Sequence, residues 1–432
     1  MRTAKRGSGL NRALALGATV VVAAALAVSA TAPAASGTGL AASGNAALDW
    51  YQYAGQEINQ AAQMRNQPQR ARLEMGMVQG AVYDAVNAIA GTNQPYLAAP
   101  PARPWYSQDA AAATAAYRMV IALLPDRQPV LEPLYTQSLS AIPNGAAKTG
   151  GIRVGEAAAE AMLAARENDG RDGPRQPVIG TEPGVWRPTP PDFAMTDSAW
   201  IGDVKPFLIP SAEGLRTRGP NRLTSGIYAK EFNETKQLGA ANSATRSREQ
   251  REVALYWDQA PWGEIFVSLA RSQNLNTNDT ARVLAMVSLA GADAEITCIS
   301  EKNYWNTWRP ITAIREAAYD GNPATRPDPD WTPLIVTPGF PEYPAGHTCG
   351  SGAIVGTLQN FFGTDKMDFA AYSPGAGTTR SFTRFSEALE EVIDSRVWGG
   401  IHWRTADKVG ARIGKRIANW EGSHYFRPVQ KG

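Results

Sequence analysis

Apolar residues recur at helical spacing along most of this chain. In the stretch 70–90, one face of a 3.6-residue period collects Met75, Val78, Val82, Val86 and Ile89. Residues 109–124 and 152–166 are rich in alanine, the strongest helix former, and helical character returns between 247 and 292. Few stretches alternate at period two, so the pattern predicts an all-α fold and argues against a substantial sheet.

Two stretches interrupt the helical pattern. Residues 95–104 form a proline-rich connection, and residues 170–220 are dense in Gly and Pro and carry Trp186 and Trp200. A loop of this length is often functional, as a lid or rim, while the two tryptophans suit a strap over hydrophobic helix surface equally well. We therefore expect three regions after the N-terminus: helical at 45–170, Gly/Pro-rich at 171–246, and a C-terminal helical bundle at 247–432.

Residues 1–35 have the organisation of a secretory signal peptide. Arg2, Lys5, Arg6 and Arg12 precede an apolar run over residues 13–28, and small residues near position 32 offer cleavage sites. The run is short for a bilayer span of about 20 residues, so a membrane anchor is the weaker alternative. No later segment is apolar enough for a span by inspection of the sequence. We predict a protein that is secreted or periplasmic, with no membrane span after signal cleavage.

The charge balance excludes a general affinity for nucleic acid. The chain has 42 Lys and Arg against 40 Asp and Glu, a net charge of +2. Loss of the four basic residues of the signal leaves 38 against 40, or −2. Such a chain has no overall positive field, so its basic residues can attract an anion only where they cluster.

Three segments in the last third of the chain gather basic residues and two of the three histidines. They are Lys302 with Arg309-Pro310 seven residues later, Pro344-Ala345-Gly346-His347, and Ser395-Arg396 leading through Gly399-Gly400 to His402. Three fixed cations, a glycine amide and two imidazoles describe a pocket for a tetrahedral oxyanion.

Spacing suggests how these segments are built. Seven residues are close to two helical turns, so Lys302 and Arg309 are expected on one face of one helix that ends or kinks at Pro310. A solvated face is the alternative, but Trp305 and Trp308 make the segment too aromatic for full exposure.

A loop is expected to enter a helix near His347, where free N–H groups would receive an anion. Gly346 and the Gly399-Gly400 pair would let the backbone approach a ligand closely. Beside three cations, His402 has a reduced tendency to protonate, which leaves a nitrogen lone pair for attack or for metal coordination. Asp407 is a weaker candidate to orient His402, because five residues do not fall on one helical stripe.

Together these motifs resemble the superfamily of vanadium-dependent haloperoxidases and type 2 phosphatidic acid phosphatases. The likeness extends to residues 81–89 and 183–191, which look like a helix and a loop of the soluble bacterial haloperoxidase branch. It therefore covers most of the mature chain. The resemblance implies an all-α fold of helical bundles, with the active site in the C-terminal bundle.

The resemblance also implies roles for single residues. In the haloperoxidases, the residue matching His402 binds vanadate, those matching Lys302, Arg309 and Arg396 neutralise its oxygens, and the one matching Gly346 donates an N–H group. The residue matching His347 handles protons while hydrogen peroxide oxidises halide, which then reacts with an organic acceptor. In the phosphatases the two histidine positions serve as nucleophile and acid for a phosphate ester.

Three interpretations follow, with vanadate or phosphate as the ligand. A vanadate-dependent haloperoxidase leads, an exported acid phosphatase using the same pocket is the alternative, and a non-catalytic oxyanion-binding protein is the third. Ala345 stands where the family has serine, which removes a hydroxyl donor at a cost on the order of 1–3 kcal/mol unless Thr348 or a water replaces it. The family's aspartate four residues after the last histidine is also displaced, since Asp407 lies five after His402.

Two further residues are secondary candidates. Phe340 matches an aromatic position near the halide site of chloroperoxidase-like members, although Ile299 replaces an expected tryptophan and leaves the halide preference open. Asp258, after Tyr256-Trp257, is a candidate partner for an active-site arginine.

The two cysteines flank the motifs. Cys298 lies one helical turn before Lys302, and Cys349 lies two residues after His347. An even count in an exported protein permits a disulfide, and the sulfurs would meet if the motifs do. We hypothesise a Cys298–Cys349 bridge; two small buried residues are the alternative.

Overall fold

Helices dominate the computed structural model, which describes residues 43–429, and the predicted all-α fold is confirmed. The sheet found within these residues is one antiparallel hairpin, β1 (Lys366–Ser373) and β2 (Thr378–Arg384). The described residues group into one compact unit. The predicted signal peptide lies outside the described residues.

The N-terminal region is built of α1 (Ala46–Met64), α2 (Arg70–Ala90), α3 (Gln108–Leu123), α4 (Gln128–Ser140) and α5 (Ala146–Ala165). Local signals fix several of their ends. The Asn45 and Ser107 side chains cap α1 and α3, and Gly91 ends α2 in the left-handed conformation with φ 62°. Small residues bring α3 and α5 close, because a Cβ on Gly151 would lie 2.3 Å from the Ser107 carbonyl oxygen.

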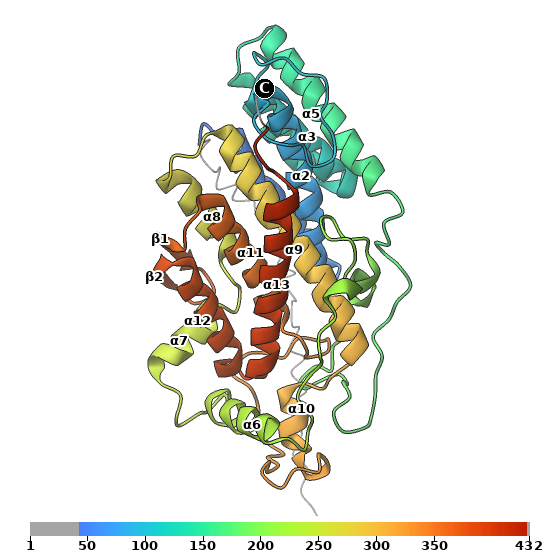
Figure 1. The fold of residues 1–432 in the computed structure, drawn as a ribbon, viewed down its shortest axis with the longest axis vertical. Helices are drawn as coiled ribbons and strands as arrows, with labels where there is room; N and C mark the ends of the chain where they lie inside the picture. The colour runs from blue at the N-terminus through green and yellow to red at the C-terminus, as the bar shows by residue number, and fades with distance from the viewer. Residues whose placement is uncertain (1–42, 430–432) are drawn as a thin grey trace, which may run out of the picture. The chain divides into compact units, whose positions relative to one another are not determined.

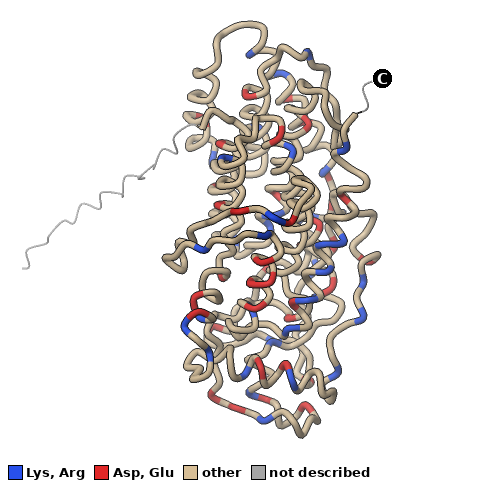
Figure 2. The backbone as a smooth tube through the Cα atoms, turned by 60° about the vertical axis from the view of Figure 1, so that its left-hand side comes forward, with Lys and Arg blue, Asp and Glu red and all other residues tan. Residues whose placement is uncertain are grey.

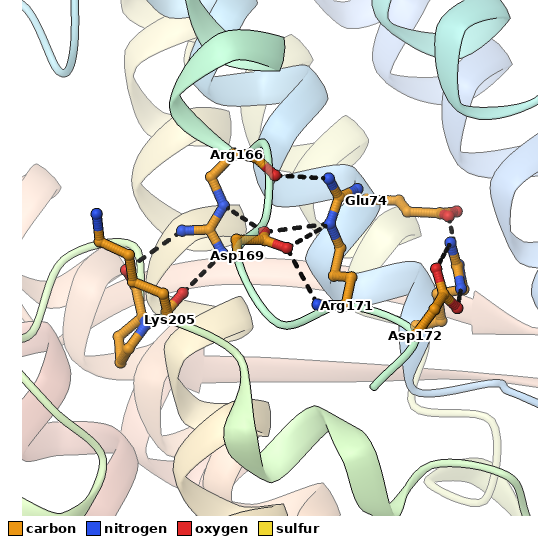
Figure 3. Close-up of polar contacts among 8 residues, drawn as sticks. Glu74, Arg166, Asp169, Arg171, Asp172 and Lys205 are labelled. Carbon is orange, nitrogen blue, oxygen red and sulfur yellow. Dashed lines mark hydrogen bonds and ion pairs between the residues drawn. The ribbon is translucent and has the colours of Figure 1, made fainter. Parts of the chain in front are cut away.

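The Gly/Pro-rich segment after α5 is held by charged contacts. Figure 3 shows the Asp169 carboxylate accepting hydrogen bonds from the Arg166 and Arg171 side chains. Arg166 also donates to the Lys205 carbonyl oxygen at 2.6 Å. Trp186 and Trp200 are both buried, so the segment straps helix surface, and its regular parts are η2 (Ala199–Asp203), η3 (Glu213–Leu215) and α6 (Gly226–Leu238). The strap interpretation therefore accounts for the two tryptophans.

The C-terminal region surrounds one long helix. Its helices are α7 (Arg248–Tyr256), α8 (Trp262–Ser272), α9 (Thr277–Trp305), α10 (Pro310–Arg315), α11 (Gly346–Phe362), α12 (Phe385–Trp398) and α13 (Arg404–His424), with a short 3-10 turn η4 (Ala317–Tyr319). In Figure 1, α9 runs through the middle of the described chain, packing against α2 of the N-terminal region and against α11 and α13. One helix thus joins the two helical regions.

The same helix corrects the expectation that no later segment has the length and apolarity of a membrane span. Among the described residues, α9 meets that test by length and composition. Its apolar stretch is 94% buried inside the protein, as in the core helix of a soluble fold, so the match is weak evidence for a span.

The prediction that Lys302 and Arg309 share one helix is wrong. α9 ends at Trp305, because Asn306 takes the left-handed conformation with φ 45°. Arg309 is the residue before α10, and Pro310 occupies the first turn of that helix, where its missing N–H costs nothing. The two cations therefore reach one place from two helices.

Charged residues are spread over the described backbone rather than gathered on one side. Figure 2 shows Lys and Arg interspersed with Asp and Glu along the whole tube. The distribution agrees with the near balance of charge in the sequence.

Candidate oxyanion site

Four predicted site residues come from four separate places and are each at least 98% buried: Lys302 on α9, Arg309 before α10, Arg396 on α12, and His402 between α12 and α13. All three cations influence the His402 imidazole electrostatically. Burying three cations is costly unless acids or an anion compensate for them. The cluster therefore calls for negative charge.

Lys302 is anchored to the loop before α11. Its ammonium donates to the carbonyl oxygens of Pro341, Glu342 and Pro344 at 2.9, 2.8 and 2.5 Å. All three N–H donors are engaged by backbone, so Lys302 contributes charge to the pocket rather than a free hydrogen bond.

The two arginines each retain an unpartnered donor. Arg309 donates Nε to the Phe340 carbonyl and Nη1 to the Ile401 carbonyl, at 2.8 and 3.0 Å, and its Nη2 has no partner among the described residues. Arg396 contacts the Trp257 carbonyl at 3.3 Å, while its buried Nε likewise lacks a partner in this part of the chain. Buried cationic donors without partners fit an anion at this place.

Hydrogen bonds fix the tautomer of His402. Its Nε2 lies 3.1 Å from Nη1 of Arg309, which can only donate, so Nε2 is the acceptor. Its Nδ1 lies 2.9 Å from Oε1 of Glu342 and donates to it. Glu342 is fully buried and also accepts from the Trp403 N–H at 3.0 Å. The lone pair that faces the cations is therefore on Nε2.

Glu342 was missed by sequence reasoning, and it takes the orienting role considered for Asp407. Asp407 is fully buried, but neither of its oxygens has a partner among the described residues. Burial and the nearby Glu342 raise the pKa of Asp407 well above its ordinary value. The only sequence signal for Glu342 was a carboxylate between Pro341 and Pro344, which no helical spacing could link to His402.

His347 shows the opposite tautomer. Its Nε2 lies 3.1 Å from the backbone carbonyl of Asp258, which can only accept, so Nε2 carries the proton and Nδ1 the lone pair. The Asp258 side chain forms an ion pair with Arg396, Oδ1 to Nη2 at 3.8 Å, as predicted for a partner of an active-site arginine. Asp258 thus positions both residues.

A helix begins near His347, as the sequence predicts, and its first turn has no side-chain cap. α11 begins at Gly346, and no side chain caps it because the residue before it is Ala345. A Cβ added to Gly346 would meet nothing within 4 Å. Thr348 does not replace the missing serine, since its hydroxyl donates to the Ala345 carbonyl at 3.1 Å.

The Gly399-Gly400 pair serves packing instead of ligand approach. A Cβ on Gly399 would lie 2.5 Å from the Ile335 side chain, and one on Gly400 would lie 2.5 Å from the Gly239 carbonyl oxygen. Gly400 also has φ 81°, a conformation that favours glycine. The expectation for this pair is corrected accordingly.

Burial sets the protonation of the site. It lowers the pKa of Arg309 to about 9 and also lowers that of Lys302. Burial, reinforced by neighbouring arginines, holds the pKa of both His347 and His402 well below 6.5. Burial raises the pKa of Glu342 to about 7. Both imidazoles are therefore neutral near pH 7.

Phe340 lies against the cations. Its ring centroid is 5.1 Å from Lys302 Nζ and 4.8 Å from the guanidinium carbon of Arg309. These cation–π contacts place the Phe340 ring beside the two cations.

The hypothesised disulfide is absent. Cys298 and Cys349 are both buried free thiols that contact each other, and Cys298 also donates to the Pro344 carbonyl at 3.5 Å. The motifs do bring the sulfurs together, but both sit in the packed core between α9 and α11 as thiols. The alternative of two small buried residues is the one found.

A cavity of about 740 Å³ opens onto part of this site. His347, Arg396 and Asp258 line it, together with residues of α1 and α2 from the N-terminal region. His402, by contrast, lies outside its lining. Reactants that enter here therefore meet His347 and Arg396.

The residues fit an oxyanion such as vanadate or phosphate. Two buried guanidinium donors are unpartnered, the α11 N-terminus is uncapped, and the Nε2 lone pair of His402 faces the same cations. Within residues 43–429, no three His, Cys, Asp or Glu side chains gather as ligands for a metal cation.

Comparisons with known proteins identify relatives of the region that contains this site. A family model described as the VCPO second helical-bundle domain matches residues 282–431. Vanadium chloroperoxidase of Curvularia inaequalis is 29% identical over 183 residues, covering 32% of this chain. The aligned part spans 29% of that relative, less than a third of its length.

Two solved structures share the fold. The first bacterial vanadium-dependent iodoperoxidase has a TM-score of 0.76 at 24% identity, covering 89% of this chain and 98% of that one. A holo-type bacterial vanadium-dependent chloroperoxidase has a TM-score of 0.67 at 18% identity, covering 83% and 92%. At these identities the likeness establishes the fold.

Proposed function

We infer that this chain, which belongs to the superfamily of vanadium-dependent haloperoxidases and type 2 phosphatidic acid phosphatases, is a vanadate-dependent haloperoxidase. The observation that carries the proposal is a buried cluster in which His402 Nε2 contacts Arg309 Nη1, while Arg309 Nη2 and Arg396 Nε have no partner among the described residues. Such a pocket supplies one nitrogen ligand and several donors to one tetrahedral anion.

Bound vanadate would supply a Lewis-acidic centre at which hydrogen peroxide can oxidise halide. His402 Nε2 would ligate it in place of its contact with Arg309 Nη1, while Arg309 Nη2, Arg396 Nε and the Gly346 N–H would donate to its oxygens. Lys302 would balance its charge without a direct hydrogen bond, because its donors already bind backbone carbonyls. Glu342 would hold the His402 ring in the required tautomer.

His347 is suited to move the proton. Its Nδ1 is free to accept while Nε2 donates to the Asp258 carbonyl. Its lowered pKa keeps the base form available near neutral pH. We assign it as the general base toward hydrogen peroxide, returning the proton as water forms.

The discriminating experiment uses protein freed of bound oxyanion. Peroxide-dependent bromination or iodination of a dye that appears only after vanadate is added supports the proposal. Absence of halogenation at every vanadate concentration, together with retained phosphate binding, would contradict it and favour the non-catalytic interpretation.

One observation favours the phosphatase as second candidate. Glu342 accepts the Nδ1–H of His402 and so orients the imidazole with its lone pair on Nε2, as a histidine nucleophile requires. Hydrolysis of a phosphate monoester that vanadate inhibits, with no halogenation, would identify this activity.

We propose export as the cellular route, supported by the basic and apolar organisation of residues 1–35. Fractionation of cells expressing the full chain tests it. Retention of an uncleaved chain in the cytoplasm would contradict it.

A further inference from the structure

The cavity beside His347 is much larger than the small reactants require. Its volume is about 740 Å³, whereas a water-sized ligand occupies about 30 Å³. Pockets for organic ligands typically measure about 300–1,000 Å³. The cavity thus has room for an organic molecule next to the proposed general base.

One wall of the cavity is aromatic and rigid. Tyr51 of α1 and Trp262 and Phe266 of α8 line it. Phe266 meets Tyr51 edge-on at 6.1 Å between centroids and lies nearly parallel to Trp262 at 6.4 Å. The Trp262 N–H donates to the Ser351 hydroxyl at 2.9 Å, which fixes the ring. Trp262 is 5% and Phe266 8% exposed, so an aromatic ligand would meet the exposed rim of these packed rings.

Arg72 of α2 supplies a cation that no motif predicted. It lines the same cavity and contributes to lowering the pKa of His347. Glu295, a buried carboxylate on α9, holds its Nε at 3.2 Å. The side chain is 31% exposed, so part of the guanidinium faces the cavity.

A missing side chain on α11 makes room for Arg72. A Cβ on Gly350 would lie 2.1 Å from Nη1 of Arg72, so only glycine lets the guanidinium rest against α11. Gly350 lies three residues after His347, one turn along the same helix. The space left by Gly350 holds Arg72 close to the site, and among the described residues Glu295 is its acidic partner.

We propose that this cavity binds the organic acceptor, and that the acceptor is an electron-rich aromatic carboxylate. Its carboxylate pairs with Arg72 and its ring lies along Trp262 and Phe266. The proposal rests on the proposed haloperoxidase function. Hypohalous acid formed beside His347 then transfers its halogen to a ring carbon, which loses its proton, and water is released.

The test compares 4-hydroxybenzoate with its neutral analogue 4-hydroxybenzamide. Calorimetry on the intact wild-type protein should show tighter binding of the carboxylate. Arg72→Gln should weaken carboxylate binding about 10- to 100-fold, as expected for loss of a charge-assisted hydrogen bond, and change amide binding less than about twofold. Arg72→Lys should restore part of the preference.

Two further variants control for folding and place. Arg118→Gln removes an arginine of α3 that pairs with Glu156 of α5, outside the cavity, and should leave both affinities unchanged. Gly291→Met should weaken both probes, because Gly291 lines the cavity and a Cβ there meets nothing within 4 Å. Equal effects of Arg72→Gln on the two probes, or no effect of Gly291→Met, would overturn the proposal.

Halide oxidation is measured separately, as triiodide formation from iodide and peroxide without an acceptor. Binding of 4-hydroxybenzoate that depends on Arg72, without triiodide formation, would support the cavity as a carboxylate site and contradict the proposed haloperoxidase function. Triiodide formation without Arg72-dependent binding would support the enzyme and overturn the cavity.

Discussion

His402 and His347 lie in the same field of buried cations, yet they present opposite ring nitrogens. His402 donates from Nδ1 to Glu342 and accepts at Nε2 from Arg309, whereas His347 donates from Nε2 to the Asp258 carbonyl and carries its lone pair on Nδ1. Burial is the largest cause that lowers the pKa of both. Burial and the shared field of cations keep both rings neutral, so the hydrogen-bond partner decides which nitrogen of each ring carries the lone pair.

Solvent access separates the two rings further. His347 lines the large cavity, whereas His402 is 2% exposed and walled in by Arg309 and Glu342. A ligating group benefits from enclosure, because a fixed geometry favours one bound anion. A proton-transferring group must meet the reactant. The comparison therefore predicts different losses from the two histidines.

The largest effect is expected from His402→Ala, which removes the Nε2 ligand. Vanadate binding and halogenation should fall by more than the roughly 10- to 100-fold typical for loss of a ligand's supporting group. Vanadate titration by calorimetry, with activity in parallel, measures both. Substantial vanadate-dependent activity in this variant would mean that another residue ligates.

His347→Ala should separate binding from turnover. Vanadate affinity is expected to stay near that of wild type, while kcat falls by about 10²- to 10⁴-fold, the usual contribution of a general base. The same two measurements decide. If affinity and kcat fell together as in His402→Ala, the two histidines would not have distinct roles.

Glu342 provides the matched test of orientation. Glu342→Leu should weaken vanadate binding about 10- to 100-fold, because the His402 ring loses the acceptor for Nδ1–H. Glu342→Gln keeps an oxygen acceptor and should recover much of the affinity. Similar losses in both variants would indicate that charge, not orientation, is what Glu342 contributes.

The sequence predicted the residues of this site better than their arrangement. Helical periodicity and alanine content were sufficient for the all-α fold, and the ordered motifs for Arg309, Arg396 and His402. The spacing of Lys302 and Arg309 misled, because Asn306 and Pro310 end one helix and start another. The residues that end one helix and start the next therefore outweighed the seven-residue spacing.

Spacing along the sequence could not predict contacts between residues that lie far apart in the chain. Glu342 meets His402 across 60 residues, and Arg72 reaches the cavity from α2 because Gly350 lacks a Cβ. Neither pair shares a period or a motif. The predicted role of Gly399 and Gly400 failed for a related reason, since their neighbours, Gly239 and Ile335, lie far away in sequence.

A smaller effect concerns pH. The pKa of His347 is held well below 6.5 by burial and then by Arg396, so its base form should persist as pH falls through 6.5. The acid limb of kcat/KM is therefore expected below pH 6.5, and Arg72→Gln should move it toward higher pH by removing one cation. A pH profile of halogenation measures both. A limb at or above 6.5 in wild type would exclude His347 as the titrating base.

The smallest effect is expected from restoring the hydroxyl that the sequence lacks at position 345, next to Gly346 and His347. Ala345→Ser adds a hydroxyl before the uncapped α11, where it can accept a helix N–H or donate to an anion. We expect about 1 kcal/mol of added stability or about two- to tenfold tighter phosphate binding. Thermal unfolding with and without phosphate separates the two, and Ala353→Ser, a buried site further along α11, is the control. If phosphate binding did not tighten and apo stability rose, the hydroxyl would be capping the helix, and Ala345 would cost the pocket nothing.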